Sequence, residues 1–278
     1  MRSVKFIAAA GAVTVLSTSA FAADMAIAPP PAYYPPPVVE EFGGWYLRGD
    51  IGFSNQRVKN IDIANYRDPG ITIPSQTLGF DSAGIAQIGV GYQVNNWFRA
   101  DITGQYRGGA NFHGLDLVSF NGAPLGADTY SAKKSEFVVM GNVYADLGTW
   151  WCVTPFIGAG VGWSRNTISN FVDQGVSFSN AFGTSPTTAY TRTASKWNFA
   201  YALHAGLAYK VSNSLTVELG YSYMNLGDGV TGGLTDFLGN TRNNAFTFKD
   251  ITSHDLKLGV RWSLDAAPAY APPLIRKG

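Results

Sequence analysis

The segment Lys196–Leu226 reads KWNFAYALHAGLAYKVSNSLTVELGYSYMNL and contains two runs in which every second residue is apolar. The residues between them are mostly small, polar or charged. This alternation indicates two β-strands, which the short connection at 211–214 joins. The apolar positions are Trp197, Phe199, Tyr201, Leu203, Ala205, Leu207 and Tyr209, followed by Leu215, Val217, Leu219, Tyr221 and Tyr223.

Both strands are longer than the ~5 to 6 residues usual in a globular sheet. Their length suits the ~9 to 11 tilted residues with which a strand crosses a bilayer. In a transmembrane barrel the apolar face contacts lipid and the polar face lines the interior. We therefore predict an all-β chain that folds as an antiparallel, up-and-down transmembrane β-barrel.

The N-terminus predicts export. Arg2 and Lys5 precede the apolar run 6–16, and Ala20-Phe21-Ala22 is a small-residue cleavage site, so residues 1–22 should be a signal peptide. A transmembrane anchor is the alternative, but the run is shorter than the ~20 residues that a spanning helix needs. Loss of Arg2 and Lys5 changes the formal charge from +1 to −1. A nearly neutral chain gives no argument for a nucleic-acid partner.

The alternation recurs often enough for eight strands. We expect them at residues 45–58, 82–94, 97–107, 136–147, 153–165, 197–210, 215–223 and 254–264. Long loops at 59–81, 108–133, 166–195 and 227–251 alternate with short turns, as extracellular loops alternate with periplasmic turns in outer-membrane barrels. Because the number of strands is even, both termini should lie in the periplasm.

Proline marks the two ends of the chain. Nine of the fourteen prolines lie at 29–37 and 268–273. We therefore expect a Pro-rich periplasmic linker at 23–43, the barrel at 44–264 and a Pro-containing periplasmic tail at 265–278.

Aromatic residues near the strand ends predict two interfacial girdles, where amphipathic rings are favoured. This membrane girdle comprises Trp45, Trp97, Trp150, Trp151, Trp163, Trp197, Tyr209, Tyr221, Tyr223 and Trp262.

Charged residues at inward positions predict an ion-pair network in the lumen. Eight strands enclose a space just wide enough for side chains, and an unpaired buried charge is costly. The side chains should therefore pair and plug the lumen, although a small diffusion pore is the alternative. The network comprises Arg48, Asp50, Arg99, Asp101, Glu136, Asp146, Glu218, Lys257 and Arg261.

Catalytic and cofactor sites are not indicated. Gly158, Gly160 and Gly162 lack the spacing of a dinucleotide loop and should relieve crowding in the lumen. His204 should be a hydrogen-bonded lumen residue rather than a base, since no G-x-S-x-G motif is present. Cys152 is the only cysteine, which excludes an intramolecular disulfide and a thiolate metal cluster. We expect no enzyme activity, cofactor or metal.

Three segments resemble the eight-stranded outer-membrane barrels of alphaproteobacteria: 91–101 (GYQVNNWFRAD), 154–162 (TPFIGAGVG) and 258–262 (LGVRW). These are opacity-type surface antigens, often called a porin family and distantly similar to the OmpA membrane domain. The resemblance covers about residues 44–264. Such chains usually stop at a terminal aromatic residue, whereas 14 residues follow Leu264 here.

The resemblance implies a protein of the Gram-negative cell outer membrane, where lipid and lipopolysaccharide surround it and the barrel-assembly machinery inserts it. We expect a structural surface protein that stabilises the membrane and presents its loops to the exterior. The family also implies an alternative, a haemin or host-ligand receptor whose loops would use His113, Tyr130 and Phe171.

Overall fold

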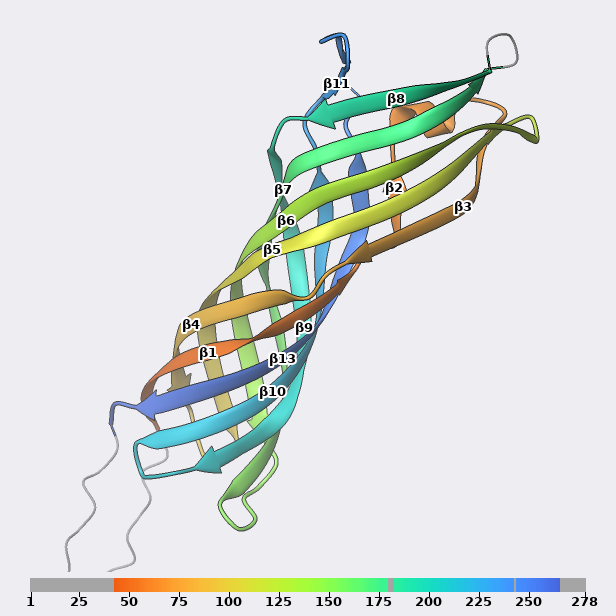
Figure 1. The fold of residues 1–278 in the computed structure, drawn as a ribbon. Coiled ribbons are helices and arrows are strands. Elements are labelled where there is room, and N and C mark those ends of the chain that lie inside the picture. The colour runs from red at the N-terminus through yellow and green to blue at the C-terminus, as the bar shows by residue number, and fades with distance from the viewer. Residues whose placement is uncertain (1–42, 180–182, 243, 266–278) are drawn as a thin grey trace, which may run out of the picture. The chain divides into compact units, whose positions relative to one another are not determined.

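The computed structural model describes residues 43–179, 183–242 and 244–265. The signal peptide, nearly all of the Pro-rich linker and the tail beyond Asp265 lie outside these residues. Among the residues described, no helix is long and apolar enough to cross a membrane. Figure 1 shows a fold that consists almost entirely of β-strands. The strands are β1 (Gly44–Arg57), β2 (Asn60–Asp62), β3 (Ile71–Phe80), β4 (Ala83–Gln93), β5 (Phe98–Phe120), β6 (Ala123–Asp146), β7 (Val153–Ser179), β8 (Gly183–Thr191), β9 (Ala194–Lys210), β10 (Leu215–Val230), β11 (Leu234–Asp236), β12 (Thr241–Arg242) and β13 (Thr247–Ser263), with one 3₁₀ turn, η1 (Ala64–Arg67).

Eight of these strands form a closed antiparallel ring. Its order is β1, β4, β5, β6, β7, β9, β10 and β13, and each strand pairs with the next. Pairing of β13 with β1, from Tyr46 opposite Ser263 to Arg57 opposite Thr252, completes the ring. The predicted all-β, up-and-down antiparallel architecture is therefore confirmed.

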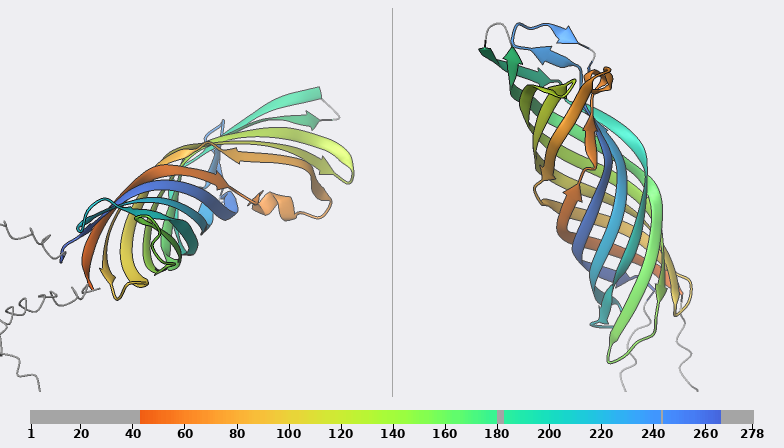
Figure 2. Two further views of the ribbon diagram at one scale, coloured as in Figure 1. Left: turned by 90° about the horizontal axis from the view of Figure 1, so that it is seen from below. Right: turned by 90° about the vertical axis from the view of Figure 1, so that its right-hand side faces the viewer.

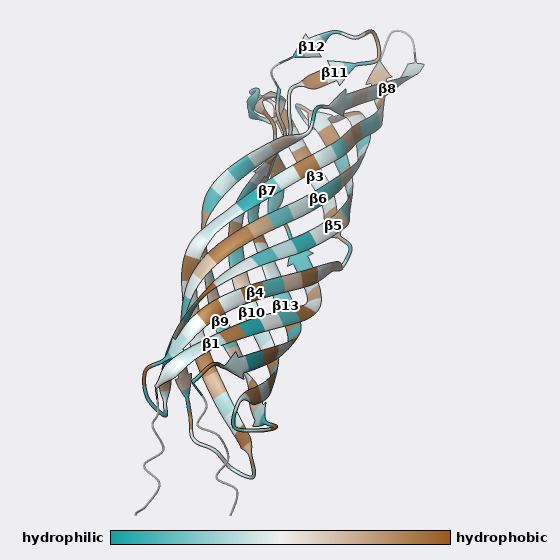
Figure 3. Cartoon of the chain, turned by 90° about the vertical axis from the view of Figure 1, so that its left-hand side faces the viewer, coloured by the Kyte–Doolittle hydropathy of each residue, from teal (hydrophilic) through white to brown (hydrophobic). Residues whose placement is uncertain are grey.

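The ring has the predicted orientation of side chains. In β1, Arg48 and Asp50 are buried whereas Ile51 and Phe53 are exposed, and the same alternation runs along every strand of the ring (Figure 3). The aromatic residues expected in the girdle all lie on the outer surface, although Tyr223 is only half-exposed. The outer surface is thus the apolar one.

The ranges expected to be long loops are mostly strand, so that part of the sequence prediction is wrong. β5 continues to Phe120 and β6 begins at Ala123, with the turn at Asn121 and Gly122, both of which have positive φ. The segment expected to be the longest loop continues β7 to Ser179 and contains β8. β3 pairs with β5 in the range expected to be the first loop. These strands continue well beyond the rest of the ring (Figures 1 and 2).

Two sections can now be defined. The lower section is the ring itself, residues 44–57, 83–107, 136–165, 194–226 and 251–264. The upper section is the extension beyond it, residues 58–82, 108–135, 166–193 and 227–250. Register shifts lie near the boundary in several strands, including Arg107/Ala110 in β5 and Asn225/Gly227 in β10. A bulge moves the following residues to the other face of the sheet. In β5 the buried residues are accordingly odd-numbered up to Arg107 and even-numbered from Ala110.

An apolar cluster fills the inside of the upper section. Phe112, Phe171 and Phe248 are at most 1% exposed, and the ring centroids of Phe112 and Phe248 are 4.9 Å apart. Ile61 and Ile63, from the segment between β1 and β3, belong to the same cluster. The cluster also includes Met140 and Met224 of the lower section. It therefore covers the upper end of the ring's interior.

Candidate functional site

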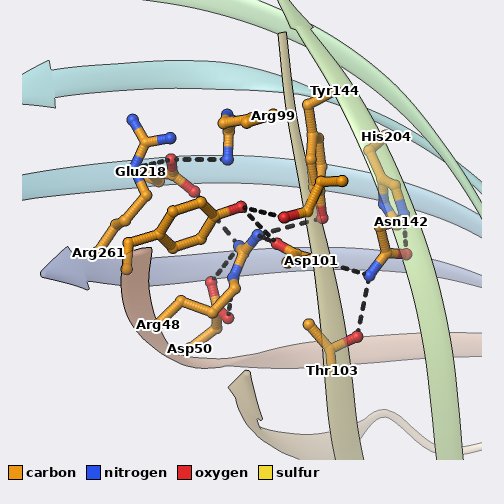
Figure 4. A network of polar contacts seen from close by, with 12 residues as sticks. Arg48, Asp50, Arg99, Asp101, Thr103, Asn142, Tyr144, His204, Glu218 and Arg261 are labelled. Carbon is orange, nitrogen blue, oxygen red and sulfur yellow. Dashed lines mark hydrogen bonds and ion pairs between the residues drawn. The ribbon is translucent and has the colours of Figure 1, made fainter. Parts of the chain in front are cut away.

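The inside of the ring holds charged side chains from most of its strands. Eight of the nine residues predicted for the lumen lie together, and we call them the lower charged cluster. They are Arg48, Asp50, Arg99, Asp101, Asp146, Glu218, Lys257 and Arg261. All are buried except Arg261, whose side chain is 12% exposed. Figure 4 shows part of this cluster around Arg48 and Glu218.

Arg48 links three carboxylates of this cluster. Its guanidinium nitrogens lie 2.8 Å from Asp50 Oδ1, 2.9 Å from Asp101 Oδ2 and 3.3 Å from Glu218 Oε2. Arg48 Nη1 also donates to Tyr144 Oη at 3.1 Å. An arginine presents several donors in a fixed plane, so one side chain can hold acids from different strands in one arrangement.

Glu218 in turn contacts three basic side chains of the cluster. Besides Arg48, its carboxylate lies 3.4 Å from Arg99 Nη1 and 3.4 Å from Arg261 Nε. Arg99 also contacts Asp146 at 3.2 Å, and its guanidinium carbon lies 4.3 Å from the centroid of the Tyr144 ring. Cation–π contacts of this kind help to hold a guanidinium that has lost its water.

The lower charged cluster is balanced. It contains four cations and four carboxylates. Lys257 forms no ion pair within 4 Å among the described residues, but it is coupled to Asp50 through Gln87, which accepts from Lys257 Nζ at 3.2 Å and donates to Asp50 Oδ2 at 2.7 Å. Balanced, hydrogen-bonded charges avoid the cost of an unpaired buried ion.

His204 extends the network through hydrogen bonds. One ring nitrogen lies 2.9 Å from Ser222 Oγ and the other 3.1 Å from Asn142 Oδ1. Asn142 Nδ2 in turn donates to Asp101 Oδ1 at 2.7 Å. His204 therefore lies where the sequence pattern placed it, in the lumen and hydrogen-bonded. The cavity beside His204 and Ser222 has a volume of only about 10 Å³, room for at most one water molecule.

A second set of charges lies where the ring meets the upper section, and only one of its members, Glu136, was predicted from the sequence. We call it the upper charged cluster: Arg107, Lys134, Glu136 and Asp255. Arg107 lies 3.4 Å from Glu136 and 2.5 Å from Asp255, and Lys134 also contacts Glu136. All four side chains are fully buried. Arg107 lies two residues after the inward Gln105, and Lys134 lies two residues before the inward Glu136. This spacing would have been enough to predict from the sequence that both side chains point inward.

The three glycines of β7 line a crowded interior, as expected. A Cβ atom added to Gly158 would lie 2.5 Å from the Tyr144 ring, and one added to Gly160 would lie 2.1 Å from Asn142 Oδ1. At Gly162 it would meet the carbonyl oxygen of Val139 at 2.0 Å. Larger residues would displace the side chains that fill the lumen.

The residues suggested for haemin do not form a common surface. Tyr130 and Phe171 are 3% and 1% exposed, and their rings pack together inside the upper section. His113 is exposed on the outer face, 3.9 Å from Asp81. Within the described part of the chain, no group of three or more His, Cys, Asp or Glu side chains is arranged to hold a metal ion.

Comparison with known proteins gives the family. The outer membrane protein beta-barrel domain matches residues 8–263. A Rickettsia bellii protein named "Putative adhesin" is 30% identical over 79% of this chain and 88% of its own length. An uncharacterised Brucella abortus protein is 28% identical over 67% of this chain and 69% of its own length. The crystal structure of Neisserial surface protein A is 14% identical and covers 79% of this chain and 97% of that one, with a TM-score of 0.43. This chain belongs to the outer membrane protein beta-barrel family and is a protein of the cell outer membrane.

Proposed function

We propose that this chain is a non-conducting surface protein that stabilises the outer membrane and holds its upper section outside the cell, where it meets an external ligand. The observation that carries this proposal is the filling of the ring. Two balanced charged clusters and an apolar cluster occupy successive levels of its interior. A solute would have to break ion pairs between arginines and carboxylates at two of these levels.

The direction of the barrel in the membrane follows from its asymmetry. The strands extend far beyond the ring at one end only, and outer-membrane barrels have short turns on the periplasmic side. Since Gly44 and Ser263 lie at the short-turn end, we place both termini in the periplasm. The outward aromatic residues then contact lipid and, in the outer leaflet, lipopolysaccharide. The closing strand β13 is the segment we assign to the barrel-assembly machinery.

A catalytic role has little geometric support. Among the described residues, Ser222 and His204 form the one buried pair of a hydroxyl and an imidazole, which is the contact that a nucleophile and its base need. Ser222 is only 1% exposed, and the adjacent cavity does not admit a substrate. An external role as a binding surface agrees with the name of the Rickettsia bellii relative.

Electrical recording in planar bilayers tests the closed lumen. The refolded protein should give no steady current, while a sixteen-stranded porin prepared in the same way gives one, since such porins enclose an aqueous channel. Correct folding of both samples is checked by their different gel mobility before and after boiling. Steady, ion-selective currents that change in Glu218→Gln would show that the lumen conducts and would refute the proposal.

A further inference from the structure

Three aspartates lie close together on the inner face of the upper section. Asp116 of β5 is directly opposite Asp128 of β6, and Asp173 of β7 is opposite Tyr130, two residues along β6. Like charges directly opposite each other destabilise a sheet. Burial and the nearby Asp128 and Asp116 raise the pKa of Asp173 to about 7. The three carboxylates therefore share one region of negative charge.

These carboxylates differ from the buried acids of the ring. Every acidic residue of the two charged clusters contacts an arginine or lysine. In the described part of the chain, no basic side chain lies within ion-pair distance of Asp116, Asp128 or Asp173. Asp116 is 0% exposed, and its Oδ2 accepts from Tyr66 and Gln76 while its Oδ1 accepts nothing from the described residues. Asp173 Oδ1 is buried and unpartnered in the same way. Unpaired buried negative charge of this kind is costly and favours a positively charged ligand.

A cavity lies beside this cluster. Its volume is about 240 Å³, whereas about 10 to 15 Å³ on the same measure is enough for one water molecule. Its walls come from β7, β8 and the β11–β12 hairpin and include Asp173, Thr187, Thr188, Leu234, Asp236 and Arg242. Asp236 uses its Oδ1 to accept from the backbone of Leu238 and Asn240. Asp173 is therefore the carboxylate of the cavity that has no hydrogen-bond or ion-pair partner among the described residues.

Gly175 leaves room for a second carboxylate, that of Asp128, which does not line the cavity itself but lies next to its wall. A Cβ atom at this position would lie 1.9 Å from Asp128 Oδ1 and 2.9 Å from Thr187 Oγ1. The missing side chain thus lets the Asp128 carboxylate lie over the β7 backbone, near a hydroxyl of the cavity wall. In the cavity, Asp173 and the hydroxyls of Thr187 and Thr188 supply acceptors, and Leu234 adds an apolar surface. Arg242 brings one positive charge to the lining, which the negative charge of Asp173 and Asp236, with Asp128 behind the wall, outweighs.

We propose that this cavity binds a primary alkylammonium group, carried either by a small diamine or by a lysine side chain. A compact ammonium with three donors suits a site made of carboxylate and hydroxyl oxygens, and a short methylene chain suits Leu234. A metal ion is less suitable because the described carboxylates are not arranged as a ligand set. This proposal rests on the proposed function, because the ligand can reach the cavity only if the upper section lies outside the cell.

Titration calorimetry of the full-length protein refolded in detergent tests this assignment. Cadaverine should bind at pH 8, and 1,5-pentanediol, which has the same chain without charge, should not. N-acetyl-lysine amide tests the lysine side chain as the source. Binding by either amine supports the proposal, and the arm that binds identifies the source. This measurement is independent of conductance and of the direction of the barrel, so its failure is distinct from failure of the proposed function.

Two variants make the test specific to the site. Asp173→Asn should weaken amine binding at least tenfold, while Asp68→Asn, an exposed aspartate away from the cavity, should leave it unchanged. Binding should also weaken from pH 8 to pH 6 as Asp173 takes up a proton. The other charged and titratable groups around it are Asp116, Asp128, Tyr66 and Tyr130 on one side and Asp236 and Arg242 on the other. The proposal would be overturned if neither amine binds, or if the diol binds as well as the amine. It would also be overturned if calcium chloride alone binds, or if correctly folded Asp173→Asn still binds the amine fully.

Discussion

The lower and upper sections of this barrel have opposite interiors, although the same strands run through both. In the lower section Arg99 and Asp101 of β5 are buried and Ile102 is 63% exposed. In the upper section Phe112 of the same strand is 0% exposed, while Asn111 and His113 face outward. The medium outside explains the difference. We infer that lipid favours apolar residues on the outer face of the ring, whereas water around the upper section favours the burial of apolar side chains inside it.

The bulges allow one strand to serve both environments. In β5 the shift at Arg107/Ala110 exchanges inward and outward positions near the boundary. The two interiors are then held by different forces. The lower section depends on balanced ion pairs, which are sensitive to the loss of one partner, and the upper section depends on apolar packing and contains unpaired acids.

Removing one lumen acid should have the largest effect. Glu218→Ala leaves Arg48, Arg99 and Arg261 without a shared carboxylate in a buried site. We expect the free energy of unfolding to fall by about 3 to 5 kcal/mol. Urea titration followed by the boiled and unboiled gel forms measures this change. Asp68→Ala, at an exposed acid, is the matched control and should stay within about 0.5 kcal/mol of the wild type. A Glu218 variant as stable as that control would show that lumen water screens these charges.

One substitution placed in both sections tests the boundary between them. Ile102 and Leu117 both lie on the outer face of β5, with 63% and 43% exposure. Ile102→Arg puts a charge into lipid and should cost about 2 to 4 kcal/mol, whereas Leu117→Arg should change stability by less than about 0.5 kcal/mol. Urea unfolding of both variants in lipid vesicles gives the comparison. Similar costs at the two positions would mean that the membrane reaches further along β5 than we infer.

The lower section could be predicted from sequence because lipid imposes one simple pattern. The alternation in 197–209 correctly gave the outward residues, and the same rule placed Arg48, Asp101 and Glu218 inside. The members of the upper charged cluster that were overlooked, Arg107 and Lys134, follow that rule too. Arg107 is the last residue of an expected strand, and Lys134 lies two residues before the next one, where no alternation was recognised.

The upper section was not predictable in the same way. From Ala110 the inward parity of β5 changes, and Asn111 and His113 occupy outward positions that the lipid pattern reserves for apolar residues. A prediction that looks for apolar residues at every outward position therefore assigns these strands as loops. The acidic cluster and its cavity depend on pairing among β5, β6, β7 and β8, which the spacing of Asp116, Asp128 and Asp173 in the sequence does not reveal.

Neutralising Asp173 should stabilise the upper section in a pH-dependent way. Its raised folded-state pKa, about 7, means that the folded chain resists ionisation, so wild-type stability falls as the pH rises from about 4 through 7. Asp173→Asn should gain about 1 to 2 kcal/mol at pH 8, after allowance for partial exposure, and nothing at pH 4. Hydrogen exchange of the β7 and β8 amides measures this gain. A uniform effect at both pH values would contradict the repulsion among the three aspartates.

The smallest effect is expected where the chain leaves the barrel. The Pro-containing tail was expected to begin at Asp265, and the carboxylate of this residue accepts from the backbone N–H of Trp45 at 2.8 Å. Next to it, Leu264 N donates to the carbonyl oxygen of Trp45 at 2.8 Å, so the backbone of β13 alone already joins β1 at this end. Because Asp265 is exposed, Asp265→Ala should cost less than about 1 kcal/mol, and a chain that ends at Leu264 should still assemble in the outer membrane. Membrane fractions analysed by boiled and unboiled gel mobility compare the two with wild type. If the truncated chain fails to assemble while Asp265→Ala assembles normally, residues beyond Asp265 take part in assembly, and closure does not depend on β13 and β1 alone.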